Sequence, residues 1–212
     1  MNPSLVLAST SPRRKELLAL LKIPFETVVP NYQEWVHAEV PPEAQARSFA
    51  LEKARSCMGR FPDRLIVGSD TLIAVGTVIL GKPAEREQAR AMLRRLRGRE
   101  HRICSAVAVC NDERKIQDVA LDTVQVWMKP FSDAELEAYL DTGEWKGKAG
   151  AYAIQGRGGE FIERIEGDFT SAVGLPLRLT ASLLAKHGLP VPVEIDQLYR
   201  DRPFPNWKTF QA

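Results

Sequence analysis

The sequence has few cysteines and histidines, and their positions argue against disulfide and zinc frameworks. Only Cys57, Cys104 and Cys110 occur among 212 residues, and none belongs to a CxxC motif. The three histidines also lack the spacing of metal ligands. We therefore expect reduced, mostly buried thiols and no disulfide framework or zinc site.

Long hydrophobic runs and an excess of one charge are absent as well. No segment approaches the roughly 18 apolar residues of a membrane span, and the N-terminus lacks the charged-then-apolar pattern of a secretion signal. The net charge of +2 is too balanced to indicate binding to nucleic acid or to a membrane. The sequence thus predicts a cytoplasmic protein in which any anionic ligand binds to a local basic cluster.

Strand, helix and loop signals alternate along the chain, which is typical of an α/β protein. The patterns predict strands over 4–8, 25–29, 64–70, 101–110 and 116–128, with a hairpin over 72–80. They predict helices over 12–22, 42–57, 84–97, 133–141 and 174–187. Residues 189–212, rich in proline and aromatic residues, are predicted to be irregular, either docked through the aromatics or mobile.

The first strand runs into the turn Ser9-Thr10-Ser11-Pro12-Arg13-Arg14. Ser11 suits the N-cap of the following helix, and Pro12 suits its first position. Two arginines in a first helical turn are unfavourable unless an anion compensates them, because the helix N-terminus already carries partial positive charge. The turn therefore predicts phosphate binding, with a solvated arginine pair as the alternative.

Other segments supply further chemistry. Asp70, at the end of the predicted strand 64–70, could hold Mg²⁺ or accept a proton from water, or simply form a turn. Lys82 in Gly81-Lys82-Pro83 could reach a phosphate, although surface lysines before proline are common. Gln155, in the glycine-rich segment 147–159, has the donor and acceptor needed to read a base edge; a flexible loop with a solvated amide is the alternative.

Taken in order, these segments resemble the Maf family of nucleoside triphosphate pyrophosphatases. The resemblance runs from about residue 5 to residue 188. It rests on many short motifs in sequence: Ala8–Arg14, Glu34, Glu52-Lys53-Ala54, Ser69-Asp70-Thr71, Gly81-Lys82-Pro83, Met92-Leu93 through Gly98 to His101, Tyr139 with Thr142-Gly143-Glu144, Lys148–Tyr152, Ile154-Gln155-Gly156 and Val173–Pro176.

The resemblance implies a two-lobed α/β fold similar to inosine triphosphate pyrophosphatases, with a mixed twisted sheet, flanking helices and a cleft between the lobes. This domain would span residues 1–188, followed by a C-terminal tail over 189–212. The resemblance also implies a homodimer, a divalent cation (Mg²⁺, or Mn²⁺ or Co²⁺), and hydrolysis of a nucleoside triphosphate to the monophosphate and pyrophosphate.

Roles for individual residues follow from the same resemblance. Asp70 would be the general base or a metal ligand, and Glu34 would help to hold the metal. Lys53 and Lys82 would act in catalysis by neutralising charge on the triphosphate. The substrate-binding residues would be Ser11, Arg13, Arg14, Thr71 and Gln155.

The family has a branch that resembles dTTP/UTP pyrophosphatases and another that prefers 7-methyl-GTP. Arg13, Thr71 and Gln155 match the first branch, which favours dTTP, UTP and modified pyrimidine nucleotides as substrates. Residues 105–107 and 168–172 depart from the family pattern, and both segments could reshape the pocket for base or ribose. A substrate such as 7-methyl-GTP, or a broader range of nucleotides, is the alternative.

Two functions of other classes fit the same motifs. One is a nucleotidyltransferase, which would need a second substrate as acceptor. The other is a nucleotide-binding regulator of septum formation that does not turn the nucleotide over.

Overall fold

The computed structural model describes residues 4–210, and its centre is a seven-stranded mixed sheet in the order β2-β1-β3-β5-β6-β7, with β4 paired to β3. The short strand β1 (Leu5–Ala8) pairs in parallel with β2 (Phe25–Val28) and β3 (Leu65–Val75). The remaining strands pair antiparallel: β4 (Val78–Leu80), β5 (Glu100–Asn111), β6 (Ile116–Met128) and β7 (Ile162–Glu166). The predicted α/β class with a mixed sheet is confirmed.

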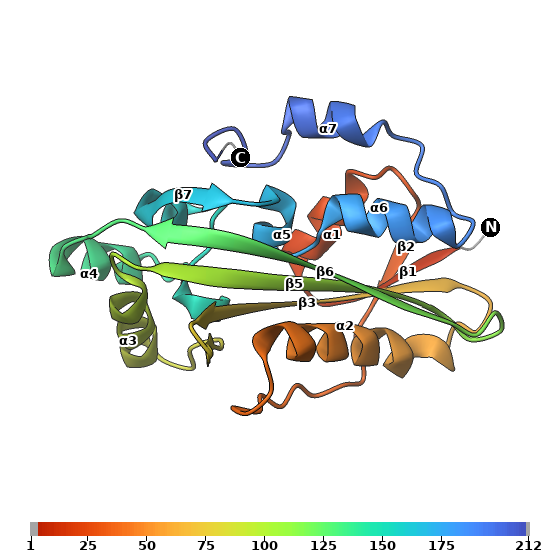
Figure 1. Cartoon of the computed structure of the whole chain (residues 1–212), viewed down its shortest axis with the longest axis horizontal. Helices are drawn as coiled ribbons and strands as arrows, with labels where there is room; N and C mark the ends of the chain where they lie inside the picture. Colours follow the sequence, from red (N-terminus) through yellow and green to blue (C-terminus); the bar gives the residue numbers. More distant parts are fainter. Residues whose placement is uncertain (1–3, 211–212) are drawn as a thin grey trace.

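Helices cover both faces of the sheet (Figure 1). One face carries α2 (Pro42–Met58), and the other carries α1 (Pro12–Ala19), α5 (Phe169–Val173) and α6 (Leu177–Lys186). Two helices, α3 (Arg86–Leu96) and α4 (Asp133–Asp141), gather at one end of the long strands. The capping box of Ser132 and Glu135 is present at the start of α4 as predicted. Within residues 4–210, none of the helices has the length and apolar character needed to cross a bilayer.

The core has two layers because side chains alternate along each strand. On β1, Val6 and Ala8 pack with Phe49 and other residues of α2, whereas Leu5 and Leu7 pack with the helices of the opposite face. The same alternation continues on β3 and β5. Cys57, Cys104 and Cys110 are buried and free as expected, on the α2 side of the sheet.

The prediction that a strand ends near Asp70 is wrong. Residues 65–75 form one continuous strand, in which Ser69, Asp70 and Thr71 pair with Val107, Ala106 and Ser105 of β5. Polar residues mark the end of a strand when they face water, but here β5 supplies the backbone partners and the strand continues. The carboxylate of Asp70 therefore lies in mid-strand, on backbone that is paired to β5.

Several elements near the C-terminus were not predicted. The strand β7 and the short helix α5 were missed, and α6 starts at Leu177 rather than at Gly174, which adopts a φ of 132°. Residues 189–210 are docked on the domain, which was one of the two alternatives predicted for this tail. They also include a helix that was not predicted, α7 (Ile195–Asp201). Phe204, Trp207 and Phe210 are buried in the core.

Gly68 lets α2 lie directly against β3. A Cβ atom at this position would come within 2.2 Å of the Ala50 carbonyl oxygen and 2.8 Å of the Ala54 nitrogen. Only a residue without a side chain permits this approach. The close packing places Lys53, which lies between Ala50 and Ala54 on α2, beside the polar stretch of β3.

A buried histidine gives the fold a measurable dependence on pH. His101 is 2% exposed, and its Nε2 lies 2.6 Å from the Tyr152 hydroxyl. Burial lowers the pKa of His101 from its usual value of 6.5 to about 4. Between these values the unfolded chain binds a proton that the folded chain does not, so stability falls as the pH drops from 6.5 towards 4.

Because of His101, we expect the free energy of unfolding to be about 2 kcal/mol lower at pH 5 than at pH 7. The His101→Gln variant keeps a polar group near Tyr152 but has no such titration, so it should lose less stability over the same interval. Urea unfolding of both proteins at the two pH values measures the difference. Equal losses in the two proteins would show that His101 does not titrate on unfolding.

Candidate active site

All of the site residues predicted from the sequence line one pocket with a volume of about 460 Å³. They come from the β1–α1 turn, the segment before α2, helix α2 itself, strand β3, the loop after β4 and the glycine-rich loop. They are Ser11, Arg13, Arg14, Glu34, Lys53, Asp70, Thr71, Lys82 and Gln155.

The parallel pairing of β1 and β3 brings two of the motifs together. Ala8 is in register with Gly68, so the Ser9–Arg14 turn leaves β1 beside Ser69, Asp70 and Thr71. Ser11 occupies the N-cap position of α1 as predicted, but within the described chain its side chain makes no capping hydrogen bond to the helix. Its backbone N–H instead donates to Ser9 Oγ at 3.1 Å.

Lys53 joins the two carboxylates of the site. Its Nζ lies 2.5 Å from Glu34 Oε1 and 2.5 Å from Asp70 Oδ1. Burial alone would raise the pKa of Glu34, but Lys53, Lys82 and Arg14 outweigh this effect and hold that pKa below its usual value. Asp70 Oδ2 is buried and has no hydrogen-bond partner within the described chain. One oxygen of Asp70 is therefore left for a ligand, a water or a proton.

Arg14 is held by the polypeptide around it. Its Nε donates to the Gly174 carbonyl at 3.0 Å, its Nη2 donates to Thr71 Oγ1 at 3.3 Å, and Nη2 lies 4.0 Å from Asp70 Oδ1. Burial lowers the pKa of Arg14, and the charges of Asp70 and Glu34 oppose that shift. The guanidinium group is thus fixed next to the carboxylate of Asp70.

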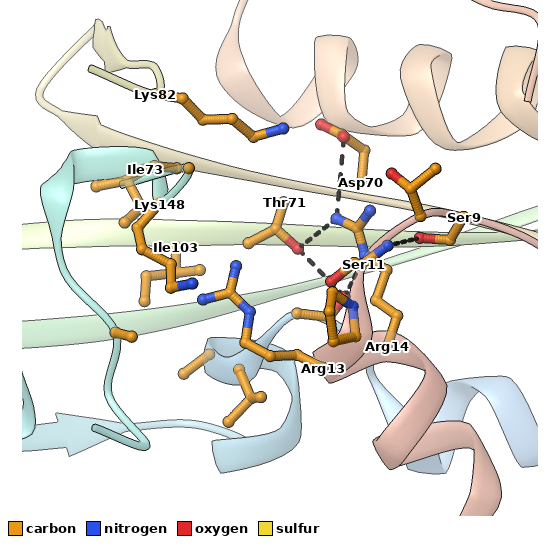
Figure 2. A pocket seen from close by; sticks show the side chains of 18 of the residues that line it. Ser9, Ser11, Arg13, Arg14, Asp70, Thr71, Ile73, Lys82, Ile103 and Lys148 are labelled. Carbon is orange, nitrogen blue, oxygen red and sulfur yellow. Dashed lines mark hydrogen bonds and ion pairs between the residues drawn. The ribbon is translucent and has the colours of Figure 1, made fainter. Parts of the chain in front are cut away.

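Three further cations face the pocket: Arg13, Lys82 and Lys148 (Figure 2). None of them forms an ion pair with a carboxylate anywhere in residues 4–210. Burial and the neighbouring charge of Arg14 lower the pKa of Arg13, and burial together with Arg13 lowers the pKa of Lys148. The charge of Glu144 opposes both shifts without cancelling them, so a bound anion would stabilise these positive charges further.

The loops that carry Lys82 and Lys148 are hydrogen-bonded to each other. The Gly150 N–H donates to the Gly81 carbonyl at 3.0 Å, so a main-chain hydrogen bond joins the loop of Lys82 to the loop of Lys148. Gly150 adopts a φ of 63°, a left-handed conformation that favours glycine. The two lysines therefore enter the pocket from a common wall.

Comparison with known proteins identifies the family. The family model described as Maf-like protein matches residues 4–187. The chain belongs to the Maf family. It is 40% identical over 189 residues to the dTTP/UTP pyrophosphatase of Bacillus velezensis, which covers 89% of this chain and 99% of that protein. It is 45% identical over 190 residues to the protein of the same name in Cereibacter sphaeroides, covering 89% of this chain and 97% of that protein.

A solved structure of the Ham1 protein of Staphylococcus aureus also matches, at a lower level. The match has a TM-score of 0.41 and 12% identity, and it covers 58% of this chain and 71% of that structure.

In this Maf-family chain, hydrogen bonds to Glu144 hold the loop that carries Gln155. The Glu144 carboxylate accepts hydrogen bonds from the N–H groups of Arg157 and Gly158, both at 2.9 Å. Gln155 Oε1 is buried and has no partner in the part of the chain that the structure describes. An unpaired buried amide oxygen is costly unless a ligand satisfies it, which favours the base-reading interpretation over the solvated one.

Thr71 lies in the pocket wall with its hydroxyl already engaged. Thr71 Oγ1 accepts from Arg14 Nη2, lies 2.9 Å from Ser105 Oγ and lies 3.3 Å from the Gly174 carbonyl oxygen. The Ser105 hydroxyl in turn donates to the Ser171 carbonyl at 2.6 Å. Thr71 thus orients Arg14, and its predicted contact with substrate remains a prediction.

Lys148 was not among the residues predicted for the site, and the structure adds it to the cations of the pocket. The sequence signal was present, since Lys148 follows Gly147 in the segment that also carries Gln155. Tyr32 and the apolar Ile73 and Ile103 also line the pocket. Hydrophobic side chains at a buried wall carry no motif, so no local pattern marks them.

The carboxylates fit a divalent cation. Within residues 4–210, no group of three or more His, Cys, Asp or Glu side chains is arranged to hold a metal. Mg²⁺, however, is usually bound through one or two carboxylates together with substrate phosphates and water. Asp70, with its unpartnered Oδ2, and Glu34, which shares Lys53 with it, supply that donor set.

Proposed function

We propose that the chain hydrolyses nucleoside triphosphates between the α- and β-phosphates, with dTTP and UTP as preferred substrates. The observation that carries the proposal is the pocket itself. It combines three cations that form no ion pair within the described residues with two buried oxygens that have no hydrogen-bond partner there. These oxygens are Oδ2 of Asp70 and Oε1 of Gln155. The relatives named dTTP/UTP pyrophosphatase support the same substrates.

The cations suit the triphosphate. Arg13, Lys82 and Lys148 would bind the β- and γ-phosphates and stabilise the charge that develops on the leaving pyrophosphate. Arg14 is held beside Asp70 and would bind close to the bond that breaks. Because the protein holds Arg14 in place before substrate arrives, little reorganisation of this group is needed in the transition state.

Asp70 would activate the attacking water, either as its general base or by holding the divalent cation. In both roles it acts through Oδ2, because Lys53 binds Oδ1. Glu34 and Asp70 would hold the cation, which when bound polarises the phosphoryl group and lowers the pKa of a bound water. Lys53 helps to keep Glu34 ionised and lies between the two carboxylates.

Gln155 would recognise the base. Its amide can donate to O4 and accept from N3–H of thymine or uracil, and the unpaired Oε1 is the acceptor that this pairing needs. Cytosine presents the opposite pattern at these positions, so it would be disfavoured.

Gln155→Ala is expected to reduce kcat/KM for dTTP and UTP by about 10- to 100-fold and to leave that for CTP nearly unchanged. Assays over dTTP, UTP, CTP, GTP, ITP and 7-methyl-GTP measure the change. Arg157→Ala serves as the control, because Arg157 is an exposed residue of the same loop and does not line the pocket. An unchanged preference in the Gln155 variant would exclude this residue as the reader of the base.

The homodimer and the location in the cytoplasm remain predictions. Sedimentation of the purified protein tests the first, and fractionation of cells tests the second.

A further inference from the structure

The C-terminal segment, residues 189–210, lies outside the part of the chain that matches the family model. After α6 the chain turns back and forms α7 across the outer side of α6 (Figure 1). Trp207 and Phe210 then stack on Phe169, with ring centroids 5.6 Å and 6.3 Å away. Trp207 is only 3% exposed. The segment is therefore fixed to the domain by aromatic packing.

This segment contacts the start of α5. The Tyr199 hydroxyl donates to Asp168 Oδ2 at 2.6 Å, and Asp168 caps α5 by accepting from the Thr170 N–H at 2.8 Å. Helix α5 leads to Gly174, whose carbonyl holds Arg14 in the pocket. Asp168 and Phe169 belong to the stretch 168–172, where the chain departs from the family pattern.

It also contacts the loop of Gln155. Asn206 Nδ2 donates to the Ile154 carbonyl at 3.0 Å and to the Gly156 carbonyl at 3.1 Å. These are the two residues on either side of Gln155. Asn206 has a φ of 62°, in the left-handed region that asparagine tolerates better than most residues. One amide group thus clamps the backbone at both sides of the base-reading side chain.

Glu144 and Asn206 hold the loop at different sets of atoms. Glu144 binds N–H groups that follow Gln155, and Asn206 binds the carbonyls that flank it. Without Asn206, the Ile154 carbonyl would lose its hydrogen bond and the Gly156 carbonyl would keep only the Gly159 N–H, so the backbone on both sides of Gln155 would be held less firmly and the direction of its amide would be less defined. Arg13, Arg14 and Lys82 lie on other elements, and Lys148 lies in a part of the glycine-rich segment that Asn206 does not contact, so we expect these cations to keep their positions.

We propose that Asn206 is a positioning residue for nucleobase selection, and that the C-terminal segment thereby forms a functional part of the substrate pocket. The inference rests on the proposed role of Gln155. Asn206 does not touch the base; it sets the orientation of the residue that does.

The test uses the full chain carrying Asn206→Asp, which keeps the size and the backbone preference of asparagine but replaces the donor with an acceptor. We expect KM for dTTP to rise about tenfold with little change in kcat. Inorganic tripolyphosphate, which has no base, serves as the second probe: we expect it to compete with dTTP, with an inhibition constant that stays within twofold in the variant. Asn206→Gly, which tolerates the same φ, should give the same pattern if the effect comes from the lost donor.

Lys208→Gln is the matched control, because it lowers the charge of the segment by one unit at an exposed position. It should leave both constants unchanged. Thermal unfolding of each variant separates a local effect from loss of the fold. An equal rise in KM for dTTP and in the inhibition constant for tripolyphosphate would overturn the inference, since it would indicate general damage to the pocket.

A double-mutant cycle tests whether Asn206 acts through Gln155. In the Gln155→Ala background, Asn206→Asp should have no further effect on KM for dTTP. A full tenfold effect in that background would overturn the inference. If Gln155→Ala changes the preference among nucleotides but Asn206→Asp does not, the role proposed for Asn206 is wrong while the proposed function stands. If Gln155→Ala has no effect, the role of Gln155 in base recognition fails together with that of Asn206, whereas the hydrolysis itself is tested by the products formed from dTTP.

Discussion

Asp70→Asn is expected to lower kcat for dTTP hydrolysis by about 10³- to 10⁴-fold. An amide cannot take a proton from water at neutral pH, and it is a poorer ligand for Mg²⁺ than a carboxylate. The change removes the free oxygen Oδ2 as a charged group while the amide oxygen can still accept from Lys53. The prediction therefore holds for both roles proposed for Asp70.

The stability of the Asp70→Asn variant should change by less than about 2 kcal/mol. Lys53 keeps Glu34 as a charged partner, so no buried ammonium is left alone. Asp141→Asn is the control: this carboxylate is exposed and pairs with Arg86 on α3, away from the pocket. Activity comparable to that of the parent protein in Asp70→Asn would show that the catalytic assignment is wrong.

Lys53→Met is expected to reduce kcat by about 10²- to 10³-fold and to change its dependence on pH. The methionine fills the space of the lysine stem, but it leaves Glu34 and Asp70 without the cation between them. The pKa of Glu34 is held below its usual value mainly by Lys53, against the effect of burial. Loss of Lys53 should raise that pKa, so that Glu34 takes up a proton at a higher pH.

The measurement is kcat/KM for dTTP from pH 5 to pH 9 in the parent and in Lys53→Met. In the parent, Glu34 stays ionised below its ordinary pKa, so activity should persist into mild acid. In the variant, the acid limb should move to higher pH, because activity is lost as the pH falls through the raised pKa. An acid limb at the same pH in both proteins would contradict the proposed link between Lys53 and Glu34.

How much of this site could be predicted from the sequence depends on the kind of interaction. Arg13 and Arg14 were predictable because a strand, a small-residue turn and a helix start are local features with a known electrostatic consequence. Glu34 and Lys53 were not predictable from local features, because each is an ordinary residue in its own segment. They were found only through the family resemblance, and the structure supplies the reason: Gly68 allows α2 to approach β3 closely enough for Lys53 to reach Asp70.

The position of Asp70 shows a different limit. Its neighbours Ser69 and Thr71 suggested the end of a strand, because small polar residues usually end strands. The pairing of β3 with β5 overrides this signal, and pairing between distant strands cannot be read from one segment. For the same reason, no pattern near Asn206 indicates that its side chain reaches the carbonyls of Ile154 and Gly156.

The most direct test of the proposed activity is ³¹P NMR of the protein with Mg²⁺ and dTTP and no other substrate. Hydrolysis between the α- and β-phosphates should produce dTMP and pyrophosphate in equal amounts. Formation of dTDP and inorganic phosphate would contradict the proposed site of cleavage. Binding of dTTP without products, or products only after an acceptor is added, would contradict hydrolysis and would favour the regulator or the nucleotidyltransferase.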